Sequence, residues 1–513
     1  MKFSTKSVVI IGAGIGGLAI ANLLAKKGWQ VDVYEQHDTV GGRAGLLEAE
    51  GFRFDTGPSW YLMPEVFEHY FGLLGERVDD YLDLIRLDPA YKVFYDYHKP
   101  ITIHADEIRD TKLFDSVEPG SGNVLRRYIE RAGRTYHTSL RYFLYNPFTH
   151  LNNFTDSSLL KELPFVISVL LRPMHSYVAK FFHSKPLQQI MEYQMVFLGA
   201  SPFKAPALFH LMSYLDFKQG VFYPQGGMYT IIESLQKIGL KYGVRYHFGV
   251  PVTSIITTAG RASGIVVGGK EVTADIVISN ADLHFTETQL VPLKYRSYPE
   301  KYWTKKVAGP SALLMYLGIK GQLLDLEHHN LLFVERWRQN FDDIFESKQW
   351  PDDASIYVSR SSATDPAAAP AGHENIFVLV PLPANPDVSD DYVAKMTERY
   401  LDQIAHIMNI PDLRSRLVYK RVFGPKDFVS NFNAWNATAL GMSHLLTQSA
   451  FFRPGSRSKK LKGLYYVGAG VQPGIGLPMC LINAEVLYKM LAGDHSNGPL
   501  AELIDPKDGS WHV

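Results

Sequence analysis

The chain has 513 residues, too many for one ordinary hydrophobic core, so two or three structural lobes are expected. Its 52 basic and 52 acidic residues leave no net charge, which gives no support for nucleic acid as a partner. The 29 Tyr, 29 Phe and 7 Trp form an aromatic surplus that suits either a long apolar tunnel or simply a large core.

The cellular compartment is indicated by the cysteine content and by the absence of targeting segments. The single cysteine, Cys480, excludes an internal disulfide framework and fits a reducing compartment. Residues 1–6 leave no room for a signal peptide, and no apolar run reaches the roughly 18 residues that span a bilayer. We therefore expect an intracellular protein that at most lies on a membrane.

The first predicted unit is a strand, a glycine-rich turn and a helix. A β-branched run at residues 8–11 indicates a buried parallel strand, and Gly12, Gly14 and Gly17 follow in the G-x-G-x-x-G spacing. The first glycine allows a tight turn, the second lets the backbone approach a pyrophosphate, and the third lets the helix at 16–27 pack closely. The N-terminus of this helix would direct its free N–H groups toward the phosphate.

The next strand, residues 30–34, ends on an acidic residue. Glu35 stands where a carboxylate accepts hydrogen bonds from ribose hydroxyls, which favours an unphosphorylated ribose, and Gln36 beside it is a further candidate contact. A second glycine pair that includes Gly42 would bring backbone close to a ligand, and Arg43 could bind a phosphate. These residues by themselves leave FAD and NAD open.

Residues 7–43 as a whole resemble the FAD-binding signature of the amine oxidase and carotenoid desaturase flavoproteins, in which a GG-R segment follows the ribose-binding acid. The resemblance implies that the cofactor is FAD. Asp55 and the turn at Gly57 and Pro58 resemble the F-D-x-G-P segment of that family, which lies beside the flavin. Standing alone, such a Gly-Pro turn would be ordinary.

Beyond this turn the pattern predicts a helix at 62–74 and two strands within 87–103, where the resembled family inserts a substrate lobe. Residues 122–199 are predicted to be helical and unusually apolar. Within them, 159–173 is nearly apolar but interrupted by prolines, and aromatic and basic residues alternate after it, namely Arg172, Tyr177, Lys180, Phe181, Phe182 and Lys185. This composition fits an interfacial helix and a packed face equally well; the lipid-dissolved substrates of the desaturase family favour membrane contact.

The middle of the chain returns to the nucleotide-binding pattern. A helix is predicted at 229–242, followed by strands at 244–252, 254–256, 264–267, 270–272 and 276–282. The ordered segments resemble the P-x-G-G-M, G-V, P-V and S-N-A-D segments of the desaturase family. This resemblance implies that the Val252 backbone contacts the adenine side of FAD and that Asn280 also contacts the cofactor.

Residues 286–445 are expected to complete the substrate lobe. Strands are predicted at 313–319, 356–359 and 376–380, a helix at 393–408, and a surface loop at 361–370. The histidines show no H-x-x-H or H-E-x-x-H spacing, so no metal site is predicted, and no G-x-S-x-G elbow suggests hydrolysis.

The last part of the chain carries a second glycine-rich motif. The L-T-Q-S-A-F-F-R-P segment at 446–454 precedes a strand predicted at 463–470, and 474–479 then begins a helix that runs to about residue 491. These segments resemble the desaturase pattern L-T-Q-S-A-x-F-R-P followed by V-G-A-G-x-x-P-G-x-G-x-P, the most specific match in the chain. The resemblance implies cofactor contacts from Gly470, Gly476, Leu477, Pro478 and Met479.

A helix N-terminus at the flavin would favour negative charge on the pyrimidine side of the reduced ring. Many family members have Thr-His before the Pro-Gly pair, whereas this chain has Val471 and Gln472, so nothing can rest on a histidine at that position. Cys480, just inside the helix, is interpreted as a packed residue.

Since the resemblance covers essentially the full length, it implies an α/β fold. The expected architecture is a Rossmann-like FAD-binding domain of the amine oxidase and carotenoid desaturase type, with an inserted α+β substrate lobe and a helical membrane-contacting region at 122–199. The FAD-binding parts are expected at 1–80, 216–285 and 446–513, and the two parts of the substrate lobe at 81–215 and 286–445.

The implied function is that of a phytoene-desaturase-type enzyme, in which FAD takes a hydride from a linear, lipid-dissolved carotenoid while a proton leaves the adjacent carbon. Alternatives are a desaturase of a later, hydroxylated or end-modified carotenoid, a polyene isomerase or saturase, and a non-catalytic flavin-binding scaffold on the membrane. Oxygen or a quinone is the expected electron acceptor, and the cytoplasmic face of a membrane the expected location. No proton acceptor stands out, so no catalytic residue is assigned.

Overall fold

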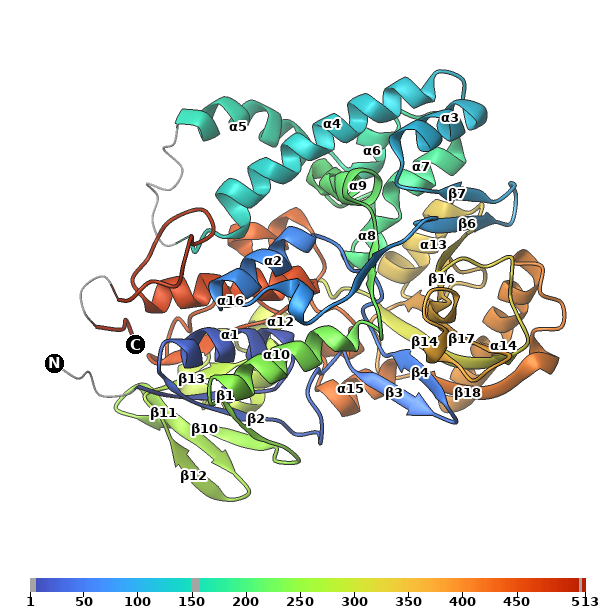
Figure 1. Cartoon of the computed structure of the whole chain (residues 1–513). Helices are drawn as coiled ribbons and strands as arrows, with labels where there is room; N and C mark the ends of the chain where they lie inside the picture. The colour runs from blue at the N-terminus through green and yellow to red at the C-terminus, as the bar shows by residue number, and fades with distance from the viewer. Residues whose placement is uncertain (1–5, 149–156, 507–509) are drawn as a thin grey trace.

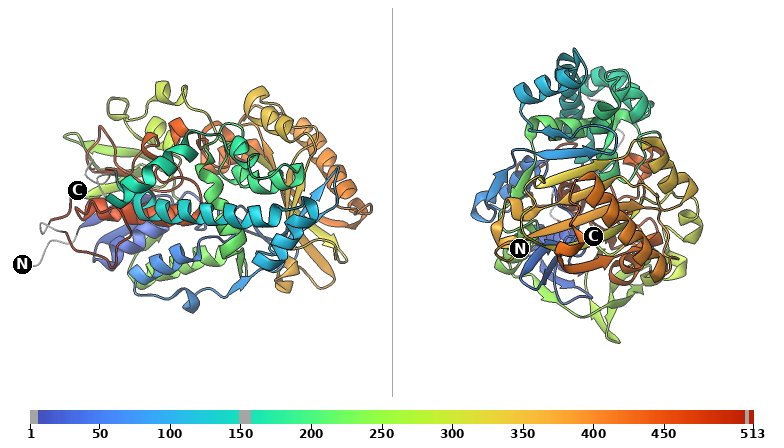
Figure 2. Two further views of the ribbon diagram at one scale, coloured as in Figure 1. Left: turned by 90° about the horizontal axis from the view of Figure 1, so that it is seen from above. Right: turned by 90° about the vertical axis from the view of Figure 1, so that its right-hand side faces the viewer.

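Two main β-sheets and a layer of helices build the protein. A computed structural model describes residues 6–148, 157–506 and 510–513 (Figure 1). In Figure 1 the first sheet lies at the lower left, the second at the right, and helices α3–α6 lie above both. The right-hand view of Figure 2 shows the helices of residues 107–219, coloured cyan to green, as a layer at the top of the molecule.

The first sheet gathers strands from three separated stretches of the chain. Its parallel strands lie in the order β19 (Leu464–Tyr466), β13 (Ile276–Ser279), β1 (Ser7–Ile11), β2 (Gln30–Tyr34) and β9 (Arg245–His247). The central strand β1 is covered on both faces. Its Val8 and Ile10 enter a core shared with helices α1 (Ile15–Lys26), α10 (Tyr229–Lys241) and α16 (Leu477–Leu491).

The opposite face of β1 presents Val9 and Ile11 to a small antiparallel sheet. That sheet consists of β10 (Val252–Thr258), β11 (Arg261–Val267) and β12 (Lys270–Thr273). Burial on both faces explains why this strand is a continuous apolar run and does not alternate with polar residues.

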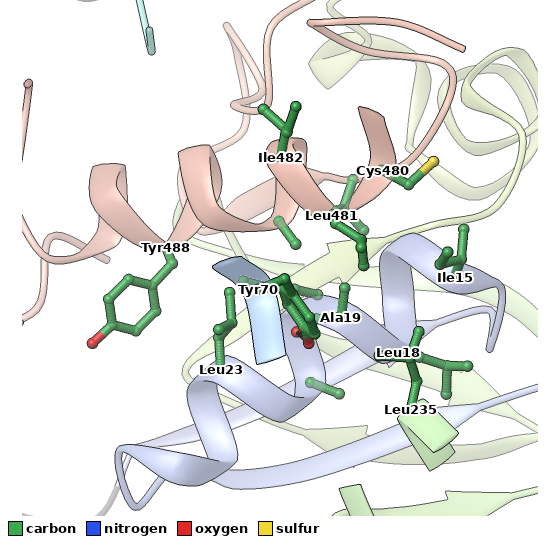
Figure 3. Close-up of a cluster of buried hydrophobic side chains, with 14 of the residues drawn as sticks. Ile15, Leu18, Ala19, Leu23, Tyr70, Leu235, Cys480, Leu481, Ile482 and Tyr488 are labelled. Atoms are coloured by element: carbon green, nitrogen blue, oxygen red, sulfur yellow. Dashed lines mark hydrogen bonds between the residues drawn. The ribbon is translucent and has the colours of Figure 1, made fainter. Parts of the chain in front are cut away.

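Helices α1 and α16 pack against each other beside this sheet (Figure 3). Leu18 and Leu481 are buried between them, and Tyr70 from helix α2 (Pro64–Leu73) donates a hydrogen bond of 2.8 Å to the Ala19 carbonyl. Cys480 is buried here, as predicted, and burial raises the pKa of its thiol to about 12. The thiol therefore stays protonated at neutral pH.

The second sheet is larger and mostly antiparallel. Its order is β18 (Leu417–Phe423), β14 (Ser311–Lys320), β17 (His373–Leu382), β16 (Ile356–Ser359), β15 (His329–Phe333), β6 (Tyr91–Tyr95) and β7 (Ile101–Ile103). Alternate residues of β14 face opposite cores. Leu313 and Met315 pack with helix α14 (Asp390–Ile407), whereas Leu314 and Tyr316 face an aromatic core beneath the helical layer.

The helical layer and several short elements pack around the two sheets. The layer contains α3 (Glu107–Val117), α4 (Ser121–Ser139), α5 (Ser157–Leu170), α6 (Met174–Val178), α7 (Lys185–Glu192), α8 (Gln194–Phe197) and α9 (Met212–Tyr214). The short elements are β3 (Leu46–Ala49), β4 (Phe52–Asp55), β5 (Leu84–Arg86), β8 (Phe222–Pro224), α11 (Leu283–Phe285), α12 (Glu300–Trp303), α13 (Trp337–Asp342) and α15 (Pro425–Phe432). Within the described ranges, no helix combines the length and the apolar character needed to cross a bilayer.

The side chains after helix α5 correct one part of the interfacial prediction. Tyr177 is 3% exposed and Phe182 is fully buried, so both belong to the aromatic core and cannot lie at lipid headgroups. The guanidinium groups of Arg131 and Arg134 lie over the Phe165 ring, 5.2 and 4.8 Å from its centroid. The inner face of α5 therefore packs on α4, as the alternative interpretation of the pattern expected.

Two other expectations differ from the structure, and two strands of the second sheet were not expected. The strand predicted at 244–252 is two strands, β9 and β10, because Gly249 has a positive φ of +66° and Pro251 has no N–H to donate to a ladder. The loop predicted at 361–370 to lie on the surface is partly buried, since Asp365 is 2% exposed and accepts the Gly226 N–H. Strands β15 and β18 were not predicted.

Candidate cofactor site

The glycine turn after β1 has the shape that its spacing predicts. Gly12 has a φ of +93°, and a Cβ on Gly17 would lie 2.2 Å from the Gly12 carbonyl oxygen. Helix α1 begins after Gly14 with no side-chain cap and no acidic residue in its first turn. This end of the helix can therefore offer backbone N–H groups and a positive dipole to an anion.

Glu35 lies directly beside this turn. Its Oε1 accepts the His37 N–H at 3.0 Å, and Oε2 accepts the Ala13 N–H at 2.7 Å. Val252, at the start of β10, shares a buried cluster with Tyr34, the residue that precedes this glutamate. The structure thus brings the predicted ribose-binding and adenine-side residues to the same edge of the first sheet.

Gln36 points elsewhere. Its Nε2 donates to the Asn431 carbonyl at 2.8 Å, and its Oε1 accepts from Asn433 at 3.3 Å. The side-chain amide thus ties the nucleotide-binding strand to the end of helix α15.

Asn280 occupies the space between the two glycine-rich turns. A Cβ on Gly14 would lie 2.8 Å from its Nδ2, and a Cβ on Gly468 would lie 2.6 Å from its Oδ1. Its backbone N–H donates to the Ile11 carbonyl at 2.8 Å. Glycine is therefore required in both turns partly by this side chain and not by a ligand alone.

Arg43 is placed next to the first turn by the glycine pair before it. The Gly41 N–H donates to the Ala13 carbonyl at 2.9 Å, and Gly42 has a φ of +57°. The nearest acidic group to the guanidinium is Asp282, at 4.0 Å, and its buried Nε and Nη2 find no hydrogen-bond acceptor within the described chain. Burial accordingly lowers the pKa of Arg43.

Arg453 is a buried arginine that sequence reasoning missed as a site residue. It is 2% exposed, and its Nη2 donates to the Ala469 carbonyl at 2.7 Å. Its Nε and Nη1 have no acceptor among the residues that the structure describes, and burial lowers the pKa of the guanidinium to about 10. A signal was available, because this arginine stands inside an apolar segment just before a glycine-rich strand.

The two arginines converge on the start of helix α16. Both lower the pKa of Cys480 through their charge, which places them around the first turn of that helix. A buried guanidinium without an acceptor is unfavourable, because its N–H groups have lost water and gained nothing. The arrangement fits an anion with several oxygens, and the diphosphate of a dinucleotide has that chemistry.

The other motif residues surround this point. A Cβ on Gly470 would meet the Leu283 side chain at 3.2 Å, and Gly476, with a φ of +124°, precedes α16. Leu477, Pro478 and Met479 form the first turn, which contains no acidic residue. This turn can therefore favour negative charge in a ligand.

The F-D-T-G-P segment joins the same assembly. A Cβ on Gly57 would lie 2.3 Å from the Arg43 carbonyl oxygen, so this glycine, and Pro58 after it, lie against the second glycine pair. The Asp55 carboxylate accepts the backbone N–H groups of Met228 and Tyr229 at 2.8 and 2.9 Å, which fixes the start of helix α10.

A cluster of aromatic and polar side chains follows this segment, and sequence analysis did not anticipate it. The Trp60 ring stacks on His329 with centroids 4.4 Å apart, and Tyr91 and Tyr193 lie 5.5 and 6.0 Å from the same ring. Behind them, Asp216 is 2% exposed, and burial raises its carboxyl pKa to about 7.

The sequence of this chain is similar to those of known proteins. Residues 15–484 match the family of flavin-containing amine oxidoreductases. A carotenoid 3,4-desaturase of Haloarcula japonica is 40% identical over 96% of this chain and 99% of its own, and a zeta-carotene-forming phytoene desaturase of Myxococcus xanthus is 34% identical over 99% of each.

Solved structures share the fold at low identity. A putrescine oxidase variant has a TM-score of 0.61 at 14% identity, covering 94% of this chain and 99% of its own. An oxidoreductase of Methanosarcina mazei has a TM-score of 0.61 at 17% identity with the same coverage. The mixed α/β architecture is therefore that of the amine oxidases.

Proposed function

The chain belongs to the flavin-containing amine oxidoreductase family, and from this premise we propose that it is an FAD-dependent desaturase that forms carbon–carbon double bonds in a linear carotenoid. This proposal rests on the similarity to two carotenoid desaturases, which extends over nearly the full length of the chain. The geometry supports it because the glycine turns and the two unpaired arginines fit the diphosphate of FAD.

In this proposal the predicted residues other than Gln36, whose amide is bonded to Asn431 and Asn433, lie around the cofactor. Gly12, Gly14 and Gly17 with the start of α1 hold the diphosphate together with Arg43 and Arg453, and Glu35 binds the ribose. Val252 lies at the adenine side, and the first turn of α16 faces the flavin. When bound, FAD supplies the group that accepts a hydride from carbon.

The protein's own contribution is to position the substrate and to exclude water. The aromatic core between the second sheet and the helical layer supplies apolar surface on which a polyene can be held against the cofactor. Of the two desaturases, the one that acts at carbons 3 and 4 is more similar to this chain. This difference favours a later, more conjugated carotenoid over phytoene as the substrate.

We also propose that helix α5 lies on a membrane surface. Its outer face presents Leu163 and Ile167, and Leu171 directly follows the helix, with its N–H donating to the Ile167 carbonyl at 3.1 Å. The three side chains are 39%, 44% and 74% exposed and four residues apart, so they form one apolar stripe. Lys161, two residues before Leu163 on the same helix, is exposed as well. An apolar stripe beside a cation suits the interface of an anionic bilayer, from which the substrate would enter.

The test is anaerobic mixing of the FAD-loaded protein with liposomes that contain either phytoene or lycopene. We expect the oxidised-flavin absorption to bleach and the extracted polyene to absorb at longer wavelength with one of the two. Bleaching with neither would contradict the desaturase and favour a non-catalytic flavin protein. Subsequent admission of oxygen or a quinone identifies the electron acceptor by the rate at which the flavin absorption returns.

A further inference from the structure

A buried histidine lies against the glycine loop that leads into helix α16. His444 is 5% exposed, and a Cβ on Gly474 would lie 2.5 Å from its Nε2. Gly474 itself has a φ of +143°, so this position of the loop requires glycine for both conformational and steric reasons. The imidazole therefore fills the space beside this loop. The residues that follow the loop begin helix α16, whose first turn is proposed to face the flavin.

The protonation of this histidine is fixed by its partner. Nδ1 lies 2.8 Å from the Leu198 carbonyl oxygen, which can only accept a hydrogen bond. Nδ1 therefore carries the hydrogen of the neutral ring, and Nε2 is left with a free lone pair. Among the described residues, Nε2 has no hydrogen-bond partner.

The surroundings keep the ring neutral. Burial is the main cause, and the positive charge of Arg453 acts in the same direction; together they lower the pKa of His444 to about 3. Arg453 is the charged group that faces this ring. At neutral pH the histidine is thus an unprotonated base in a site from which water is largely excluded.

We propose that Nε2 of His444 accepts the proton that the carotenoid loses when its new double bond forms. This inference rests on the proposed function, because it requires FAD at the glycine loops and a carotenoid beside it. Gln472, which precedes Pro473 in the loop, cannot take this role, since its amide is not basic and its Nε2 donates to the carbonyls of Ala450 and Arg453.

The bonds and electrons balance as follows. One carbon–hydrogen bond breaks with both electrons, and the hydride goes to oxidised FAD. The hydrogen on the neighbouring carbon leaves as a proton, its bonding pair becomes the new π bond, and the proton forms an N–H bond at Nε2. Loss of a hydride makes the neighbouring C–H strongly acidic, so a weak base is sufficient. The imidazolium beside Arg453 is disfavoured, so it gives the proton to solvent water once the product has left, and the base is regenerated.

Two other buried groups allow matched comparison. His210 is also a buried, neutral histidine, but its Nδ1 donates to the Ala207 carbonyl at 2.7 Å and its Nε2 lies 3.3 Å from the Thr135 hydroxyl. Asp216 is the rival base, although its Oδ2 already accepts hydrogen bonds from Tyr91, Tyr193 and Gln194. The Oδ1 of Asp216 has no partner among the described residues, but of these three side chains His444 is the one in contact with the glycine loop.

The experiment compares the wild type with His444→Gln, His444→Ala, His210→Gln and Asp216→Asn. Flavin affinity is measured by titration of the apoprotein with FAD, and flavin reduction by anaerobic mixing with carotenoid liposomes. We expect His444→Gln to bind FAD within about twofold of the wild type and to be reduced at least about a hundredfold more slowly. His210→Gln should be reduced at nearly the wild-type rate.

Two further measurements distinguish a residue that accepts the proton from one with a structural role only. Imidazole added to His444→Ala should restore part of the reduction rate. Deuterium on the carbon that loses the proton should slow His444→Gln more than it slows the wild type, because proton loss then limits the rate.

Several outcomes would overturn the proposal. These are wild-type reduction in His444→Gln, a rate loss fully explained by weaker FAD binding, or a larger loss in Asp216→Asn than in His444→Gln. If the wild-type flavin is not reduced by either carotenoid, the proposed function fails and this inference fails with it. Normal wild-type reduction with an unaffected His444→Gln overturns this inference alone.

Discussion

Glu35 and Ala13 are joined by a hydrogen bond in which the carboxylate Oε2 accepts the backbone N–H at 2.7 Å. The bond ties the end of strand β2 to the glycine turn after β1, across 22 residues of sequence. The same carboxylate holds the His37 N–H through Oε1. A carboxylate fixed at both oxygens is preorganised to receive ribose hydroxyls on its remaining lone pairs.

Replacement of this residue should therefore weaken FAD binding. We expect Glu35→Ala to raise the dissociation constant about tenfold or more, because it removes hydrogen bonds to the ribose and loosens the turn. The measurement is the flavin-to-protein absorbance ratio after purification, followed by FAD titration. Glu35→Gln, which keeps one acceptor oxygen, should lie between. Full flavin retention in Glu35→Ala would remove this residue from the site.

Arg453, buried and without an acidic partner, predicts opposite effects on the apoprotein and the holoprotein. Arg453→Met should weaken FAD binding about 10- to 100-fold by removing charge-assisted hydrogen bonds, yet leave the apoprotein as stable as the wild type or more stable, since a buried unpaired cation is lost. Arg43→Met should weaken binding likewise. Differential scanning calorimetry with and without FAD measures both effects.

A buried arginine elsewhere provides the control. Arg360 directly follows strand β16 of the second sheet, is 8% exposed and is paired with Glu374 at 3.1 Å. The glycine turns follow strands of the first sheet. Arg360→Met should lower apoprotein stability, because it leaves the glutamate unpaired, and should keep the affinity for FAD. Equal losses of FAD affinity in the Arg360 and Arg453 variants would contradict the assignment of Arg453.

Asp216 predicts a pH dependence of stability. Its carboxyl is surrounded by Tyr91, Tyr193 and Gln194, with Asp110 as the facing charge, and burial raises its pKa from 3.8 to about 7. Between these values the folded protein keeps the proton that the unfolded chain has lost. The contribution of this group to stability therefore falls as pH rises from about 4 to about 7.

The comparison with Asp216→Asn isolates this contribution, since the amide does not titrate. The unfolding free energy of the wild type relative to the variant should decline across that window by a few kcal/mol, measured by urea denaturation at each pH. If the unfolding free energies of the wild type and the variant change with pH in parallel, the Asp216 carboxyl titrates at its ordinary pKa.

The outer face of helix α5 predicts membrane binding. Combined replacement of Leu163, Ile167 and Leu171 by Gln should reduce partitioning onto anionic vesicles at least about tenfold, because each side chain loses apolar area buried in the interface. Vesicle sedimentation is a direct assay. The matched control replaces Leu240, Leu293 and Leu324, which are 59%, 74% and 79% exposed elsewhere. Equal partitioning of the two triple variants would place the membrane contact on another surface.

Local sequence patterns were sufficient to predict the elements whose burial follows a regular periodicity. Strand β2 lies at the predicted residues, and helix α16 ends at the predicted Leu491, because periodicity and punctuating glycines act over short distances. Strand β15 escaped prediction, since its His329 and Asn330 look polar and are buried only by neighbouring strands. The burial of Tyr177 likewise depends on segments distant in sequence.

The sequence by itself determined the nucleotide-binding unit, the order of its motifs and the acid at the end of β2, because each depends on residues close together in the chain. Only the tertiary structure decided which charged and basic groups face the site. Arg453 is left without acceptors by the packing around α16, and His444 is oriented by Leu198, 246 residues away. Burial and hydrogen-bond partnership are properties of the folded chain. The apolar segment around Arg453 could signal a buried arginine but not its missing acceptors, and no local pattern could reveal the surroundings of His444.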